Sequence, residues 1–150
     1  MSYSQNQTRA DLMSDSEMHT VCHVQGKLFK ISASLSFESE CFIRCFLNSE
    51  LAKQIDGVYS SLPYLGEEYI LESLQIEKSG KLRTGKPFSQ EELYSLGYVL
   101  RFWHYKTGEN SKKIYKTIRK VEDAYYILFT HMDDMDEGIE MIKKLAEKKS

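Results

Sequence analysis

The strongest constraint on the fold of this chain is the helical periodicity of residues 89–148. Ser89 is followed three positions later by Glu92, which matches a capping box at the start of a helix. Apolar residues then recur every three or four positions, as they do along the buried face of a helix. Thr107-Gly108 predicts where the first helix ends. The sequence therefore predicts a compact all-helical unit over residues 89–148.

Three more helices are expected inside this unit. Ser111 is placed to cap a short helix, and Asp133-Asp134 separates the last two helices and supplies a cap for the final one. Upstream, helical spacing also marks residues 38–78, with a loop around Pro63. The run of residues 79–88, with two Gly and one Pro, predicts the longest loop.

The segment before residue 38 shows a different period. Its apolar residues alternate strictly with polar ones, which is typical of a half-buried strand. The alternating apolar residues are Phe29, Ile31, Ala33, Leu35 and Phe37. A turn at residues 25–27 would pair this strand with the β-prone residues upstream, so we expect a β-hairpin over residues 19–37 that packs on the helices.

These patterns predict the domain organisation and the fold class. Residues 1–18 are polar and without periodicity, and we expect a flexible tail there. Residues 19–150 then form a single globular domain, which is an ordinary size for one domain. The predicted fold is α+β and dominated by about five helices, with the N-terminal hairpin as its β part. An all-α fold is the alternative.

Charge and cysteine usage exclude some classes of protein. The net charge is −2, from 20 basic and 22 acidic side chains, which argues against a protein that coats nucleic acid or a membrane surface. The three Cys and the polar N-terminus favour a reducing cytoplasm. No window is long and apolar enough to cross a membrane, so we expect a soluble cytoplasmic protein without membrane association.

No motif carries readable catalytic or metal-binding chemistry. His19, Cys22 and His23 lie close in sequence, and Cys41 and Cys45 stand one helical turn apart, but neither group has the spacing of a zinc site. The sequence holds no nucleophile motif and no phosphate-binding glycine loop. We therefore expect no catalytic residues, no metal and no cofactor, and a protein that is not an enzyme.

One catalytic alternative rests on Arg101 and His104. Helical RNA-cleaving toxins place an Arg and a His around the scissile phosphate. Here the His follows the Arg by three positions, inside the apolar run Arg-Phe-Trp-His. A helix with polar residues at the edges of its apolar faces explains the pair more simply, so an RNA-cleaving toxin is the last of the functional alternatives.

The uneven charge of the C-terminal part supports a second alternative. Residues 101–120 carry seven basic residues against Glu109 alone, and residues 121–140 carry seven acidic residues without a Lys or Arg. The two segments would neutralise each other if they pack side by side. Otherwise Thr107 to Asn110 forms the turn of a helix-turn-helix that presents a basic recognition helix to DNA. The nucleic-acid-binding residues would be Lys112, Lys113, Lys116, Arg119 and Lys120.

Several residue blocks resemble a known family. They comprise Phe42-Ile43-Arg44 with Phe46, Ser49, Ala52 and Asp56; Gly66 to Glu72; Gly97-Tyr98 with Arg101 to Tyr105; Thr107-Gly108-Glu109; Ser111 to Tyr115; and His131-Met132-Asp133. Together they resemble a family of small uncharacterised bacterial proteins found in toxin–antitoxin or mobile-element neighbourhoods. The resemblance spans roughly residues 38–145. It implies a non-enzymatic accessory or antitoxin-like protein that acts by binding a protein partner from a neighbouring gene.

Overall fold

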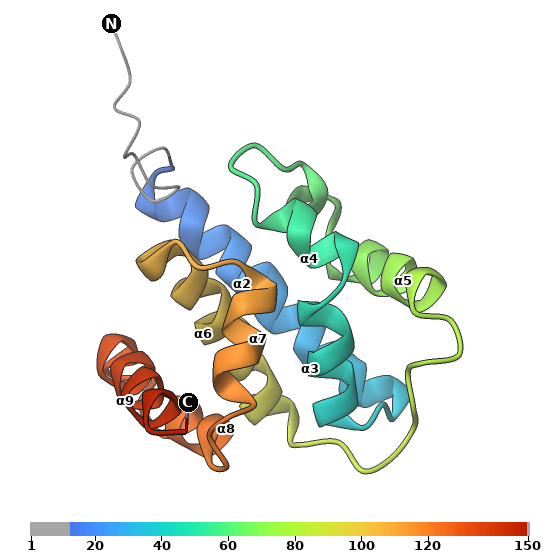
Figure 1. Cartoon of the computed structure of the whole chain (residues 1–150). Coiled ribbons are helices and arrows are strands. Elements are labelled where there is room, and N and C mark those ends of the chain that lie inside the picture. The colour runs from blue at the N-terminus through green and yellow to red at the C-terminus, as the bar shows by residue number, and fades with distance from the viewer. Residues whose placement is uncertain (1–12, 150) are drawn as a thin grey trace, which may run out of the picture.

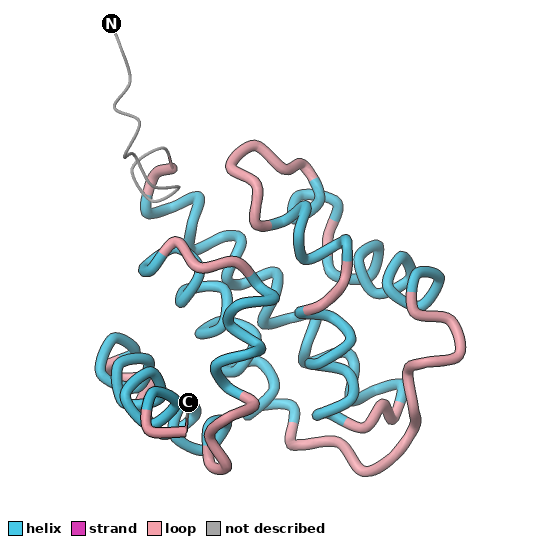
Figure 2. Tube along the Cα trace, viewed as in Figure 1, coloured by secondary structure: helices cyan, strands magenta, loops and turns pink. Residues whose placement is uncertain are grey.

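The computed structural model of the protein describes residues 13–149, and every regular element in this part of the chain is helical (Figures 1 and 2). Two short 3-10 helices accompany the α-helices: η1 covers Ala33–Leu35 and η2 covers Leu62–Leu65. The α-helices are α2 (Asp15–Ser32), α3 (Ser39–Leu47), α4 (Glu50–Ile55), α5 (Glu67–Glu77), α6 (Gln90–Thr107), α7 (Ser111–Ile118), α8 (Ala124–Thr130) and α9 (Met135–Glu147).

The predicted β-hairpin over residues 19–37, and with it the α+β fold class, is wrong. Residues 13–149 contain no strand, and the all-α alternative fits. Their one β-type contact is an isolated antiparallel bridge between Phe37 and Thr84. Residues 19–32 belong to α2, and the alternating apolar residues straddle its end, where η1 begins.

The spacing of the buried residues explains why α2 is a helix. Ser14 accepts a hydrogen bond from the Glu17 amide and caps the first turn. Buried residues then recur at helical intervals along one side of α2, so this side faces the core. They are Val21, Cys22, Val24, Gln25, Leu28, Phe29 and Ser32. Leu35, one member of the alternating set, is instead 45% exposed.

Gly26, which we expected in the hairpin turn, lies where α2 packs against α6. Figure 1 shows these two helices side by side through the middle of the molecule, and they are antiparallel. A Cβ atom on Gly97 would lie 2.4 Å from the carbonyl oxygen of Gln25. A Cβ atom on Gly26 would lie 2.8 Å from the Tyr94 ring. The two glycines therefore let the helix backbones approach more closely than any side chain would allow.

The remaining helices pack around this central pair. Helices α3, α4 and α5 lie on one side in Figure 1, α8 and α9 lie on the other, and α7 contacts α3, α4, α6 and α9. The helices predicted within residues 89–148 are confirmed, including the capping box at Ser89 and the cap that Asp134 provides for α9. None of the helices within residues 13–149 is long and apolar enough to span a membrane.

The expected tail lies outside the described residues as far as residue 12, and α2 begins at Asp15. The helix predicted after Glu38 is divided in two. Ser49 accepts a hydrogen bond from the Ala52 amide and starts α4 as a separate helix.

We expect Gly97→Ala to destabilise the protein by about 1–3 kcal/mol, because the added methyl group forces α2 and α6 apart. Chemical denaturation measures the change in the free energy of unfolding. Ser95→Ala on the same helix is the control for helix propensity. Since alanine is favoured over glycine in a helix by about 1 kcal/mol, a stabilised Gly97→Ala protein would contradict the close approach.

Candidate functional site

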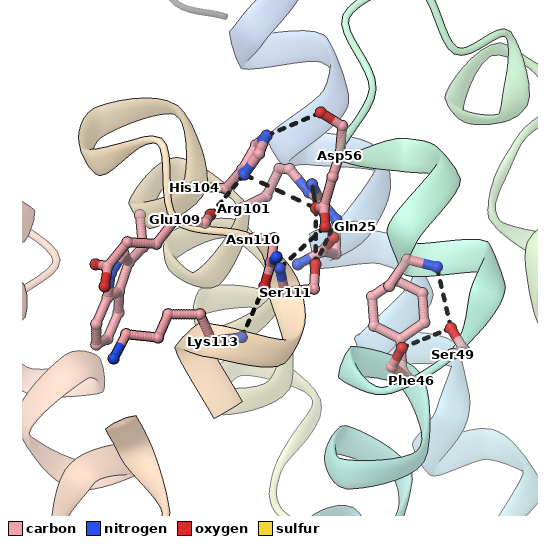
Figure 3. A network of polar contacts seen from close by, with 12 residues as sticks. Gln25, Phe46, Ser49, Asp56, Arg101, His104, Glu109, Asn110, Ser111 and Lys113 are labelled. Carbon is pink, nitrogen blue, oxygen red and sulfur yellow. Dashed lines mark hydrogen bonds and ion pairs between the residues drawn. The ribbon is translucent and has the colours of Figure 1, made fainter. Parts of the chain in front are cut away.

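A buried polar network joins four helical segments at the start of α7 (Figure 3). Its centre is Asp56, which follows the last residue of α4 and is 5% exposed. Arg101 of α6, which is 1% exposed, donates from Nη1 to Asp56 Oδ1 at 2.6 Å. Ser111 donates to the same carboxylate twice, from its backbone N–H at 3.0 Å and from its hydroxyl at 2.8 Å. The ion pair thereby fixes the first residue of α7.

Gln25 extends the network to α2. Its side-chain nitrogen donates to the Gly97 carbonyl oxygen at 3.0 Å, and its side-chain oxygen accepts from Arg101 Nε at 2.8 Å. Gln25 is 3% exposed, so both of its polar ends are satisfied within the protein. The close approach of α2 to Gly97 therefore also orients the arginine.

Opposing effects act on the protonation of Asp56. Burial alone raises the pKa of its carboxyl group, because the charged form is desolvated. The Arg101 guanidinium, the N–H of Ser111 and the nearby His104 ring outweigh burial and hold the pKa of Asp56 below its ordinary value. The carboxylate is thus charged at neutral pH and balances the buried arginine.

Arg101 and His104, the pair considered for RNA cleavage, both belong to this buried region. His104 is fully buried, with Nδ1 2.7 Å from the Glu109 carbonyl oxygen and Nε2 3.1 Å from the Asp56 carbonyl oxygen. A carbonyl oxygen can only accept a hydrogen bond. The ring therefore hydrogen-bonds both carbonyl oxygens when both of its nitrogens carry a proton. In this arrangement neither side chain faces solvent, where a phosphate would have to meet them.

The turn between α6 and α7 is held by the Glu109 side chain. The Trp103 indole N–H donates to Glu109 Oε1 at 2.9 Å, and Lys143 of α9 lies 3.3 Å from the same oxygen. These contacts outweigh burial and lower the pKa of Glu109. Gly108 adopts the left-handed conformation at φ 77°, which ends α6. The turn is therefore tied both to α6 and to α9.

The five predicted nucleic-acid-binding residues lie on the exposed side of α7 and just after it. The cap of α7 is Asn110, which accepts a hydrogen bond from the Lys113 amide at 2.8 Å, and not Ser111 as expected, because Ser111 is already the first residue of the helix. Lys112, Lys113 and Lys116 are exposed and fall within an arc of about 100° at 3.6 residues per turn. The exposed Arg119 and Lys120 continue this side beyond the end of α7. We call these five residues the cationic face.

The expected neutralisation of the basic segment by the acidic one is limited. Lys106 pairs with Asp136 at 3.7 Å, with both side chains more than half exposed. Within residues 13–149, no residue of the cationic face lies within 4.0 Å of a carboxylate oxygen in an ion pair. The positive charges of this face are therefore directed to solvent.

A cavity of about 230 Å³ adjoins the cationic face, and a lysine from another helix also lines it. Lys53 of α4 and Lys112 of α7 both line it, together with Asp56, Asn110 and Ser111. The cavity thus connects the buried network to the surface. Its position gives the cationic face a neighbour on α4 that the sequence did not indicate.

The cysteine and histidine groups do not form a metal centre in the part of the chain that the structure describes. No cluster of three or more potential His, Cys, Asp or Glu ligands occurs within residues 13–149. His19 and His23 instead hydrogen-bond Tyr98 and Tyr94, each at 2.6 Å. The Cys41 and Cys45 thiols both face the Lys81 carbonyl oxygen, at 3.3 and 3.9 Å.

Asp56, Gln25 and Ser111 could not be recognised from the sequence as members of one network. Their partners are as far as 76 residues away along the chain, and no local pattern indicates such a contact. The available signal was Arg101 itself, a charged residue amid the apolar residues of a central helix. Such a residue requires a buried partner. Asp56, Arg101 and Ser111 also belong to the residue blocks that resemble the bacterial family. That resemblance stays a prediction.

The chain matches no protein-family model, no curated protein and no solved structure.

We expect Asp56→Asn to lower the free energy of unfolding by about 3–5 kcal/mol, because it leaves the Arg101 charge buried without its counter-charge. Urea denaturation at neutral pH measures the loss. Asp133→Asn, on an exposed turn between α8 and α9, is the control and should behave like the wild type. An equally small effect of both substitutions would show that the ion pair does not hold α7.

The same carboxylate predicts how stability depends on pH. Its folded pKa lies below the unfolded value of about 3.9, so its contribution is complete above that pH and is lost as the pH falls further. We therefore expect the wild type to lose more stability than Asp56→Asn between about pH 5 and pH 2. Parallel stability profiles for the two proteins would contradict the lowered pKa.

Proposed function

We propose that the protein binds double-stranded DNA through the cationic face of α7. The observation that supports this proposal is that five exposed basic residues follow one side of a short helix and its end without a carboxylate partner among residues 13–149. Unpaired cations of this kind gain affinity for phosphates by releasing condensed counterions from DNA. Lys53 beside the adjoining cavity offers a further contact from α4.

The geometry around α7 suits a helix that enters a groove. Helix α6, a three-residue turn and α7 follow one another as in a helix-turn-helix. With its side chains an α-helix is about 10–12 Å across, so a helix such as α7 fits the major groove, which is about 12 Å wide. Lys112 and Lys113 lie in the first turn, where the recognition helix of this motif contacts base edges.

The buried network would fix α7 in the orientation that binding requires. Asp56 holds the first residue of α7 by two hydrogen bonds, and Arg101 holds Asp56 to α6. A helix held in this way does not need to be ordered when DNA arrives, so little binding energy is lost to ordering.

Charge reversal tests the proposal. We expect Lys112→Glu, Lys113→Glu and Lys116→Glu together to abolish binding to a fluorescent 30-base-pair duplex, as measured by anisotropy. For the wild type, the logarithm of the binding constant should fall with the logarithm of the salt concentration. The slope would be about −4.5 if all five cations meet phosphates.

The matched control reverses three exposed lysines at the end of α9 and beyond it, Lys144, Lys148 and Lys149. It changes the net charge by the same amount, so it separates the cationic face from overall charge. This control should retain most of the wild-type affinity, and circular dichroism should show the same fold in all three proteins. DNA binding through α7 would be refuted if the wild type did not bind the duplex. It would also be refuted if the two triple variants lost the same affinity.

A separate surface supports a second candidate function, that of a non-enzymatic, antitoxin-like protein that binds a protein partner. Four large apolar side chains within residues 59–69 face solvent, and Tyr is enriched in protein interfaces. They are Tyr59 at 87% exposure, Tyr64 at 59%, Leu65 at 53% and Tyr69 at 49%. A partner encoded by a neighbouring gene, with an apolar groove, would cover such a surface.

Co-expression with the products of the neighbouring genes tests this candidate. We expect Tyr64→Ser with Tyr69→Ser to weaken a complex about tenfold or more, measured by calorimetry on the purified pair. Tyr126→Ser on α8 is the control, because Tyr126 is similarly exposed at 69% but lies on another helix. If no neighbouring product binds, or if the double variant binds unchanged, this surface is not the interface.

A further inference from the structure

A second, larger cavity lies between the first half of α2 and the second half of α6. Its volume is about 500 Å³, which is within the range of small-molecule sites. Met18 and Cys22 line it from α2, and Tyr98, Phe102 and Tyr105 line it from α6. These five residues follow helical spacing on both helices, so two facing apolar stripes form the walls of an open cavity.

The Tyr105 hydroxyl is an unusual feature of this cavity. Tyr105 is 6% exposed, yet its hydroxyl makes no hydrogen bond with any residue that the structure describes. The neighbouring tyrosines of α6 differ, because Tyr94 and Tyr98 each hydrogen-bond a histidine of α2. A buried polar group without a partner is costly, and such groups are rare in native proteins. Tyr105 lines both this cavity and a smaller one of about 10 Å³ beside Ser60 and Tyr64, and of the two only the larger has room for a partner molecule.

The titratable groups around the cavity indicate what kind of partner fits. Burial raises the pKa of Tyr105 to about 12, so its hydroxyl stays protonated and offers a hydrogen bond. Burial likewise raises the pKa of Cys22 to about 12, so its thiol is neutral. The exposed Asp15, Lys106 and His19 also line the cavity. Asp15 and Lys106 carry opposite charges, and Nδ1 of His19 is already hydrogen-bonded to the Tyr98 hydroxyl. Neither an anion nor a cation is therefore clearly favoured.

We propose that this cavity binds a small, uncharged, planar aromatic molecule whose hydrogen-bond acceptor meets the Tyr105 hydroxyl. The rings of Tyr98 and Phe102 offer apolar surface to such a molecule, and Met18 is a side chain that adapts to the shape of its neighbour. The site lies on α2 and α6, whereas the cationic face lies on and after α7, so this proposal does not depend on DNA binding.

Two probes of nearly equal shape test the proposal on the full chain. Quinoline carries a ring nitrogen that accepts a hydrogen bond, whereas naphthalene has the same size without an acceptor. We expect both to perturb the amide resonances of α2 and α6 in titrations followed by NMR. Quinoline should bind roughly threefold to tenfold more tightly than naphthalene, the usual net effect of one hydrogen bond.

Tyr105→Phe removes the hydroxyl and keeps the ring, so it should abolish the preference for quinoline. Tyr94→Phe is the matched control, because Tyr94 lies on the same helix outside this cavity and should leave the preference for quinoline intact. If the wild type bound quinoline and naphthalene equally tightly, the Tyr105 hydroxyl would not be donating a hydrogen bond to the ligand. That result would overturn the proposal. Absent binding of both probes, or a preference that survives in Tyr105→Phe, would also overturn it.

Discussion

The close contact of α2 with α6 at Gly97 is the constraint on which the rest of the structure depends. It brings the Gln25 side chain to the Gly97 carbonyl oxygen and, from there, to Arg101. Arg101 can then neutralise Asp56, which in turn holds the first residue of α7. A packing requirement between two backbones is thus transmitted through three polar side chains to the helix that carries the cationic face. Each step places a charged or polar group where burial would otherwise be unfavourable.

The helices of the C-terminal part could be predicted because their signals are local. A capping box, a terminal glycine and apolar spacing all act within a few residues, and the structure has helices where these signals occur. The N-terminal part could not be predicted in the same way. Phe29 and Phe37 are buried at an even spacing by coincidence, since one lies in α2 and the other beyond η1. Gly26 resembled a turn residue, but its small size serves the contact between helices.

The candidate site illustrates a different limit of prediction. The basic residues of α7 were visible in sequence as a run of charge, and their exposure follows from the amphipathic pattern of the helix. Whether they would be neutralised depended on how α7 and α9 pack, which local patterns do not determine. Among the ion pairs formed within residues 13–149, only one joins the basic segment 101–120 to the acidic segment 121–140. It is the pair that Lys106 makes with Asp136. Conversely, the sequence left open a catalytic role for Arg101 and His104. In the structure both side chains are buried and contact Asp56, which is distant in sequence.

The hydrogen bond between Trp103 and Glu109 has a practical consequence. The chain contains one Trp, and its indole N–H contacts the turn that separates α6 from α7. Trp103 is fully buried, so its fluorescence arises from a ring shielded from water. Any rearrangement that separates this turn from α6 changes the surroundings of the ring and shifts its emission. The protein therefore carries a built-in optical reporter at the junction of its central helix and its cationic face.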